Sequence, residues 1–310
     1  MTTLRQRLLQ GEMVFSTGVW DTISAIIVEK AGFDALHLAS VQTCASLGLP
    51  DLGLMTPEYL REAIYRITDH TSVPLIVDFE SGFGDAIRAA YWAKQFERSG
   101  ASGIHIDDYG EFNKCPWLPP YLPTLESVEA MSDRIKAICD ARKSEDFLVI
   151  ARTGAPYSSG YSNEQEALEE GIRRARIWKE AGADVIWGRA FTNEGLKRFR
   201  DEVEGPICTQ IGLGHGRTFA DSETKKAPEI DKLNVYSLYE DLGYQLIFSG
   251  VTLFPVVLQA LLENGREFRK TGDVAPLKSK ALSSVELQDL VGFESTFALR
   301  TKYPTGGISS

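Results

Sequence analysis

Short apolar runs alternate along the chain with longer segments in which apolar residues recur every three or four positions. Three to five apolar residues between turn signals are typical of a buried strand, whereas the longer period is typical of a helix that buries one face. Eight such runs occupy residues 13–16, 36–38, 73–77, 104–106, 147–151, 185–187, 207–210 and 246–248. Strands and helices that alternate eight times predict a TIM-type (β/α)8 barrel.

Glycines mark the junctions of this pattern. Gly32, Gly100, Gly182 and Gly243 each stand where a helix-type segment ends and a strand follows. Glycine adopts the left-handed conformation of a helix C-cap without steric cost. The intervals between these glycines each suit two strand–helix units.

Capping signals mark several helix starts. Thr56 and Thr192 are expected N-caps, and Ser162 with Gln165 resembles a capping box. The expected helices cover residues 57–68, 85–98, 125–141, 163–181, 193–203 and 254–270, with a helical tail over 283–301. We expect residues 1–310 to form a single barrel domain with extra C-terminal helices. The extension 283–301 either packs on a neighbouring subunit, which we favour, or covers the end of its own barrel.

Composition narrows the class of protein. The 310 residues carry a net charge of −10, which argues against nucleic acid and anionic membranes as partners. No apolar run approaches a membrane span, and the N-terminal residues lack the apolar core of a signal peptide. The four cysteines (Cys44, Cys115, Cys139 and Cys208) form no CxxC pair. These features predict a reduced, cytoplasmic protein.

Acidic residues follow two neighbouring strands. Asp78 and Glu80 come at the end of the run at 73–77, and Asp107 and Asp108 follow the run at 104–106. Parallel strands place their carboxyl ends at the same edge of the sheet. Several carboxylates at one edge repel each other unless a cation or a proton compensates, which predicts a divalent metal site. The alternative is that these acids cap the helices that follow.

Several motifs together resemble the isocitrate lyase/phosphoenolpyruvate mutase superfamily over nearly the whole chain, with most similarity to its 2-methylisocitrate lyase-like branch. They are Ala31-Gly-Phe-Asp-Ala35, Leu47-Gly-Leu-Pro-Asp-Leu-Gly53, Asp78-Phe-Glu-Ser-Gly-Phe-Gly84, Gly103-Ile-His-Ile-Asp-Asp108, Lys114-Cys115 and Ile150-Ala-Arg-Thr153. The resemblance implies a β/α barrel, assembled as a homo-oligomer (dimer or tetramer). It also implies Mg²⁺ or Mn²⁺ as cofactor and a small carboxylate as substrate.

The resemblance also implies roles for particular residues. Asp78, Glu80 and Asp107 stand at the metal-facing positions, with Asp107 where the family usually has Glu. Arg152 stands where the family grips the substrate carboxylate, a task that suits the guanidinium fork. The other interpretation of Arg152 is a salt bridge to the acids, and both are compatible.

One loop carries the expected acid/base. Cys115 stands where the lyases have a catalytic cysteine, and Lys114 beside it would lower the thiol pKa. The Gly and His that follow this cysteine in the lyases are Pro116 and Trp117 here. The alternative is an inert cysteine. We expect residues 109–123 to form a rigid lid with Trp117 over the pocket.

Other pocket positions depart from the family pattern. Ser40 is kept, Val41 and Gln42 replace glycines, and Gly154 replaces an Asp. The expected substrate-binding residues are Ser40, Gln42, Trp20, Asp51, Arg189, Gln210 and Trp117. His37 and His105 lie within strands and are expected to be satisfied core residues. The Gly-rich stretch around His215 is only a weak anion-binding signal.

The combination favours a Mg²⁺-dependent lyase that cleaves or forms a C–C bond next to a carboxylate or keto group through an enolate-type intermediate. The departures argue against isocitrate and 2-methylisocitrate as the substrate. Two alternatives stay open: a C–C or P–C bond hydrolase of the oxaloacetate or phosphonopyruvate type, and a barrel that has lost lyase chemistry.

Overall fold

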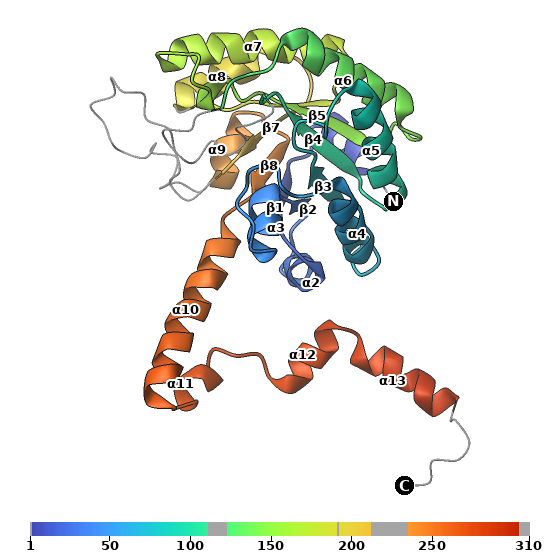
Figure 1. Ribbon diagram of the computed structural model, residues 1–310, viewed down its shortest axis with the longest axis vertical. Helices are drawn as coiled ribbons and strands as arrows, with labels where there is room; N and C mark the ends of the chain where they lie inside the picture. Colours follow the sequence, from blue (N-terminus) through green and yellow to red (C-terminus); the bar gives the residue numbers. More distant parts are fainter. Residues whose placement is uncertain (1, 111–122, 191, 212–234, 304–310) are drawn as a thin grey trace. The chain divides into compact units, whose positions relative to one another are not determined.

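The computed structural model describes residues 2–110, 123–190, 192–211 and 235–303, and its centre is a closed barrel of parallel strands (Figure 1). The strands follow one another around the barrel in chain order. They are β1 (Val14–Val19), β2 (Ala35–Leu38), β3 (Leu75–Asp78), β4 (Gly103–Asp107), β5 (Leu148–Arg152), β6 (Val185–Trp187), β7 (Ile207–Gln210) and β8 (Leu246–Ser249). The predicted TIM-type (β/α)8 barrel is therefore confirmed.

Helices surround the strands (Figure 1). They are α1 (Leu4–Leu9), α2 (Thr22–Lys30), α3 (Ser40–Ser46), α4 (Pro57–Thr68), α5 (Ala86–Arg98), α6 (Val128–Ala141), α7 (Glu164–Glu180), α8 (Asn193–Glu202) and α9 (Val235–Asp241), with a short 3₁₀ turn, η1 (Ala155–Tyr157), after β5. Thr56 and Thr192 are the N-caps of α4 and α8, as predicted.

The expected capping box at α7 is wrong. Asn163 is the N-cap, and its side chain accepts a hydrogen bond from the backbone N of Glu166. Ser162 lies one residue before the cap and donates its hydroxyl to the Glu166 side chain at 2.9 Å. The sequence offered two neighbouring capping residues, and both types are favoured at this position.

The barrel interior is layered. Alternate strand residues point inward, so apolar side chains such as Val14, Ala35 and Leu246 pack together near the N-terminal ends of the strands. Leu4 and Leu8 of α1 join this cluster and close the N-terminal end of the barrel. Further along the strands the interior becomes polar, and this change places the site at the C-terminal end.

The chain packs as two units, residues 1–254 and 255–310. Helix α10 (Leu253–Thr271) is followed by α11 (Ala275–Lys278), α12 (Ser284–Leu290) and α13 (Phe293–Lys302). The predicted helical tail over 283–301 consists of two helices, α12 and α13, because Gly292 between them adopts a left-handed conformation (φ 74°). Within the described residues, no helix has both the length and the apolarity that crossing a membrane requires.

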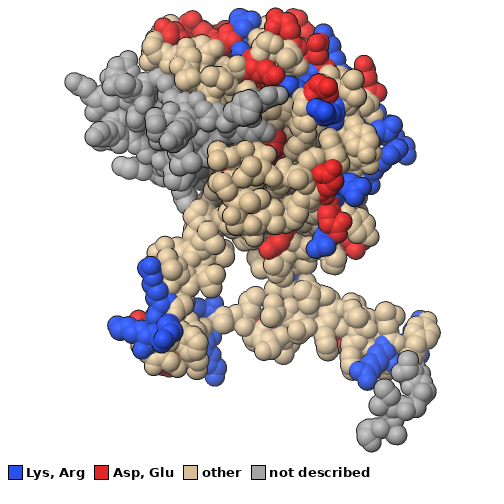
Figure 2. Space-filling view, viewed as in Figure 1, with Lys and Arg blue, Asp and Glu red and all other residues tan. Residues whose placement is uncertain are grey.

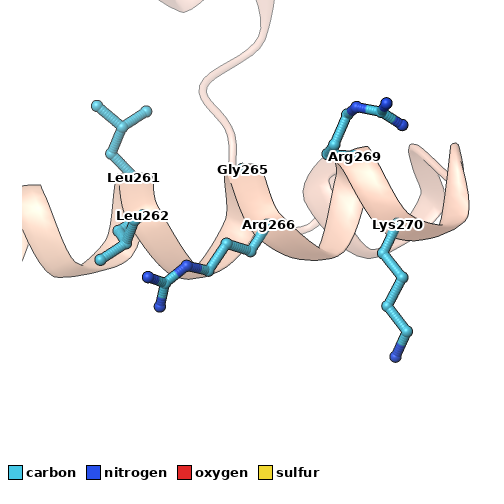
Figure 3. Close-up of a pocket in the computed structure, with 6 residues that line it drawn as sticks. All are labelled: Leu261, Leu262, Gly265, Arg266, Arg269 and Lys270. Atoms are coloured by element: carbon cyan, nitrogen blue, oxygen red, sulfur yellow. The ribbon is translucent and has the colours of Figure 1, made fainter.

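The C-terminal helices expose many apolar side chains. Val257, Leu261, Phe268, Val285 and Phe297 are each more than 40% exposed. Figure 2 shows basic side chains at the end of α10 and at the end of α13, and few charges along the stretch between them. On α10 a groove is lined by Leu261, Leu262, Gly265, Arg266, Arg269 and Lys270, and Figure 3 shows Arg269 extending to the side of the helix opposite Arg266 and Lys270.

Candidate active site

A polar cavity lies at the C-terminal ends of the strands. The strand ends and the turns that follow them supply its walls, as expected for a TIM barrel. The cavity is lined by His37, Ala39, Ser40, Val41, Asp51, Asp78, Glu80, Asp107, Arg152, Trp187, Gln210, Gly250 and Val251. The structure therefore brings together all three predicted metal-facing acids, the predicted carboxylate-binding arginine, and three of the predicted substrate-binding residues.

Asp78 ends β3 and is held by backbone donors. Its Oδ1 accepts the N–H of Glu80 at 3.0 Å, and its Oδ2 accepts the N–H of Ser40 at 3.1 Å. Burial alone would raise the pKa of Asp78, but the electrostatic influence of His105, His37 and Arg152, with the backbone hydrogen bond from Glu80, outweighs it and brings the pKa to about 2. The carboxylate is therefore ionised throughout the ordinary pH range.

Glu80 and Asp107 come together through the backbone. Glu80 adopts a left-handed conformation with φ 54°, which is uncommon for a residue other than glycine. Its carbonyl accepts the N–H of Asp107 at 2.7 Å, so the turn after β3 is bonded to the end of β4. This strained turn directs the Glu80 carboxylate to the cavity, and strain of this kind is common at functional sites.

Asp107 engages two partners. Its Oδ2 accepts a hydrogen bond from Arg152 Nη1 at 3.1 Å, and its Oδ1 lies 3.3 Å from His105 Nδ1. The Arg152 guanidinium carbon lies 4.8 Å above the ring of Trp187. Both expected contacts of Arg152, the acid cluster and the substrate side of the cavity, are thus compatible, because a guanidinium carries five N–H donors.

Two buried histidines lie beside the cavity, and one of them, His37, lines it. His37 Nε2 and His105 Nε2 lie 2.9 Å apart, and His105 Nε2 lies 3.7 Å from Asp78 Oδ2. Both rings are buried beside the stacked rings of Trp187 and Phe248, whose centroids are 4.3 Å apart. His105 is satisfied as expected. His37 is only half satisfied, since its Nδ1 has no hydrogen-bond partner among the described residues.

The fourth acid points elsewhere. Asp108 Oδ1 accepts the N–H of Gly154 at 2.6 Å, and Oδ2 accepts Arg174 Nη1 at 3.0 Å. Burial raises the pKa of Asp108 to about 7, against these hydrogen bonds, which favour the ionised form. Asp108 therefore fastens β4 to α7 and to the turn after β5, and it does not belong to the cavity.

The acid group fits a hydrated divalent cation. Asp78, Glu80 and Asp107 offer buried carboxylate oxygens on one cavity, next to half-buried Asp51. Among the described residues, however, no three Asp, Glu, His or Cys side chains are grouped closely enough to hold an ion directly. Mg²⁺ dehydrates reluctantly and is commonly held by one or two carboxylates and several waters. The donor set fits such an ion better than a closed carboxylate cage.

Three predicted substrate-binding residues have other surroundings. Gln42 is buried and donates its side-chain amide to the Gly250 carbonyl, so it ties α3 to the end of β8. The ring of Trp20 packs edge-on against Phe254 at 4.8 Å. Arg189 is partly buried just after β6 and is outside the described lining of the cavity. Their roles toward substrate stay predictions.

Most of the loop predicted to carry the acid/base lies outside the described residues, including Lys114, Cys115 and Trp117. His215 also lies outside them. The base of this loop is described. Gly110 donates its N–H to the Thr124 carbonyl at 2.9 Å, and Tyr109 and Leu125 form an antiparallel bridge. The two ends of the loop therefore leave the barrel side by side, next to Asp107.

Sequence reasoning missed three features of the site. It treated His37 as core, and gave no role to Tyr109 or Arg174. The available signal was the alternation of side chains along a strand. His37 and His105 lie two residues before Ala39 and Asp107, and therefore point to the same inward side as these residues. Two polar residues at inward positions under an acid cluster indicate a layered polar network.

Comparisons with known proteins agree with this geometry. The family model described as phosphoenolpyruvate phosphomutase matches residues 4–267. A 2-methylisocitrate lyase from Aeropyrum pernix is 32% identical over 94% of this chain and 86% of its own length. An oxaloacetate acetylhydrolase complex with 3,3-difluorooxalacetate superposes with a TM-score of 0.82 at 25% identity, covering 97% of this chain and 95% of the other. A phosphonopyruvate hydrolase complex with oxalate and Mg²⁺ superposes with 0.78 at 26% identity, covering 97% and 98%.

Proposed function

Because the chain belongs to the isocitrate lyase/phosphoenolpyruvate mutase superfamily and its relatives mark it as an enzyme of the carbon–carbon lyase type, we propose that it is a Mg²⁺-dependent lyase acting on a small substituted carboxylic acid. We propose that this acid is neither isocitrate nor 2-methylisocitrate. The observation that carries the proposal is the meeting of Asp78, Glu80, Asp107 and Arg152 on one cavity at the C-terminal end of the barrel.

Some residues of the site supply charge, and others hold these residues in position. Arg152 binds the substrate carboxylate with its guanidinium fork while Asp107 and Trp187 hold that fork in place. Asp78 and Glu80 supply negative charge for a cation, Asp78 being fixed by two backbone donors. When bound, the divalent cation supplies positive charge that stabilises the negative charge developing beside the cleaved bond.

Substrate turnover tests this proposal. The purified protein is assayed with substituted malates, oxaloacetate, phosphonopyruvate and 2-methylisocitrate, in Mg²⁺ and in excess chelator. We expect turnover of a substituted malate, its loss in chelator, and its recovery with added Mg²⁺. Turnover of oxaloacetate or phosphonopyruvate would favour the hydrolase described below. Asp78→Ala should abolish it, whereas Asp140→Ala, an exposed acid on α6, should not. Turnover that persists unchanged in excess chelator would contradict the proposal.

A hydrolase is the second candidate. Two solved structures that resemble this chain across nearly its whole length are of an oxaloacetate acetylhydrolase and a phosphonopyruvate hydrolase. Turnover in ¹⁸O-labelled water separates the two classes. A hydrolase places one solvent oxygen in an acid product that a lyase forms without it.

We also propose that the enzyme is a homo-oligomer. The apolar side chains exposed along α10–α13 support this, since exposed apolar patches commonly mark interfaces. Sedimentation equilibrium is expected to give a dimer or tetramer of the 34.3 kDa chain. A monomer at micromolar concentration would contradict it.

A further inference from the structure

We propose that His37 is a positioning residue of this site: through His105 and Asp107 it fixes the orientation of the Arg152 guanidinium. His37 is distant in sequence from the acids and the arginine, and it binds neither substrate nor metal in this scheme. The inference rests on the proposed function in one respect, namely that Arg152 binds a substrate carboxylate.

A continuous chain of contacts carries the proposal. His37 Nε2 lies 2.9 Å from His105 Nε2, and His105 Nδ1 lies 3.3 Å from Asp107 Oδ1. Asp107 Oδ2 then accepts Arg152 Nη1 at 3.1 Å. The chain thus crosses the barrel interior from β2 through β4 to β5. Because Asp107 uses a different oxygen for each neighbour, its carboxylate cannot turn without losing one of them.

The direction of one bond is fixed by chemistry. The Asp107 carboxylate can only accept, so His105 Nδ1 is the donor. The bond between the two imidazoles then needs one donor and one acceptor, and whichever Nε2 carries that proton, the bond fixes the plane of the His105 ring. Without His37, His105 Nε2 keeps Asp78 Oδ2 at 3.7 Å as a polar neighbour. We expect the ring to turn toward Asp78 and release Asp107.

Two aromatic rings, those of Trp187 and Phe248, pack against the residues of this series of contacts. The ring of His37 packs 4.7 Å from Phe248, and that of His105 packs 4.8 Å from Trp187. Trp187 also lies under Arg152. Burial, with His105 beside it, holds the pKa of His37 well below its usual value. His37 is therefore neutral and places no second cation beneath the arginine.

Paired variants test the inference. His37→Phe keeps an aromatic ring but loses the bond to His105, whereas His37→Gln keeps an amide near the Nε2 position. Oxalate binding in Mg²⁺ and binding of Mg²⁺ alone are measured by calorimetry, with exposed His70→Phe as the control. We expect His37→Phe to weaken oxalate at least tenfold and to change the affinity for Mg²⁺ alone by a smaller factor, because Asp78 and Glu80 stay on the cavity. His37→Gln should stay within threefold of the wild type for both. Wild-type oxalate affinity in His37→Phe would overturn the inference.

A crystal structure separates this inference from the proposed function. A wild-type protein that fails to bind oxalate in Mg²⁺ would count against the proposed function. The position of Arg152 in crystals of His37→Phe then decides the inference: an intact Asp107–Arg152 bond overturns it, and a displaced guanidinium in an unchanged barrel supports it. Should His37→Phe fail to fold, His37→Asn replaces it, because its shorter amide does not reach His105 Nε2.

Discussion

The ring of Tyr109 lies directly on the Cα of Gly154, so closely that any Cβ at residue 154 would overlap the ring carbons. Gly154 has φ −87°, which any residue adopts, so glycine is required by its neighbour and not by its backbone. Tyr109 is 2% exposed and belongs to the bridge between the two ends of the predicted lid. The glycine that stands where lyases of the family have Asp is thus explained by the tyrosine.

This contact predicts a coupled pair of substitutions. Gly154→Ala should destabilise the protein by about 1–3 kcal/mol, the usual cost of overpacking, as measured by urea unfolding. Adding Tyr109→Ala should remove most of that extra cost, because the space is then vacant. The control is Gly160→Ala, where the nearest atom is at an ordinary 3.7 Å. Additive effects of Gly154→Ala and Tyr109→Ala would contradict the coupling.

The low pKa of Asp78 predicts that the fold loses stability in acid. The pKa is about 2 in the folded chain and 3.8 for the ordinary group, so the unfolded state binds more protons between these values. The ionised carboxylate therefore stabilises the fold fully above pH 4 and loses that contribution as pH falls toward 2. The difference should be about 2 kcal/mol. Urea unfolding of the wild type and Asp78→Asn in chelator, from pH 2 to 5, measures it. Unfolding free energies of the two proteins that change in parallel with pH would contradict this prediction.

Arg189 predicts a preference for substrates with an additional anionic or strongly accepting group. By the family resemblance, Arg189 stands where the lyases usually have Glu, and the resemblance therefore implies a local charge that differs by two units. Arg189→Glu should raise KM at least about tenfold, the usual scale for losing a charged hydrogen bond, with little change in unfolding free energy. Arg173→Glu, whose side chain is 54% exposed on α7, is the matched control. An equal effect of both variants would argue for a general charge effect.

Cys115 stays the predicted acid/base. Cys115→Ser should reduce turnover by about a hundredfold or more, the scale of a positioned proton donor, and should leave Mg²⁺ binding nearly unchanged. Cys139→Ser is the control, since the Cys139 thiol on α6 contacts the Gly182 carbonyl at 3.3 Å and is remote from the cavity lining. Near-normal turnover of Cys115→Ser would remove this thiol from the mechanism and favour the hydrolase.

The strands and their acidic ends could be predicted because parity and strand ends are local properties of the sequence. Asp78, Glu80 and Asp107 needed only the rule that parallel strands end together. Asp108 was grouped with them although strand alternation turns it to the opposite side from Asp107; only its partner, Arg174 of α7, depends on the packing of a distant element. The bond from the Gln42 amide to the Gly250 carbonyl could not be predicted, because it joins residues far apart along the chain.

The residues that close the N-terminal end of the barrel are synthesised at different times. Leu4 and Leu8, which close the N-terminal end, are made first, while Leu246 in the same cluster is made about 240 residues later. At roughly 5–20 residues per second, the ribosome needs on the order of ten to fifty seconds to cover that distance. For that interval the first helix has no completed barrel to bury its leucines. The nascent chain therefore offers an apolar N-terminal segment to chaperones until its last strand emerges.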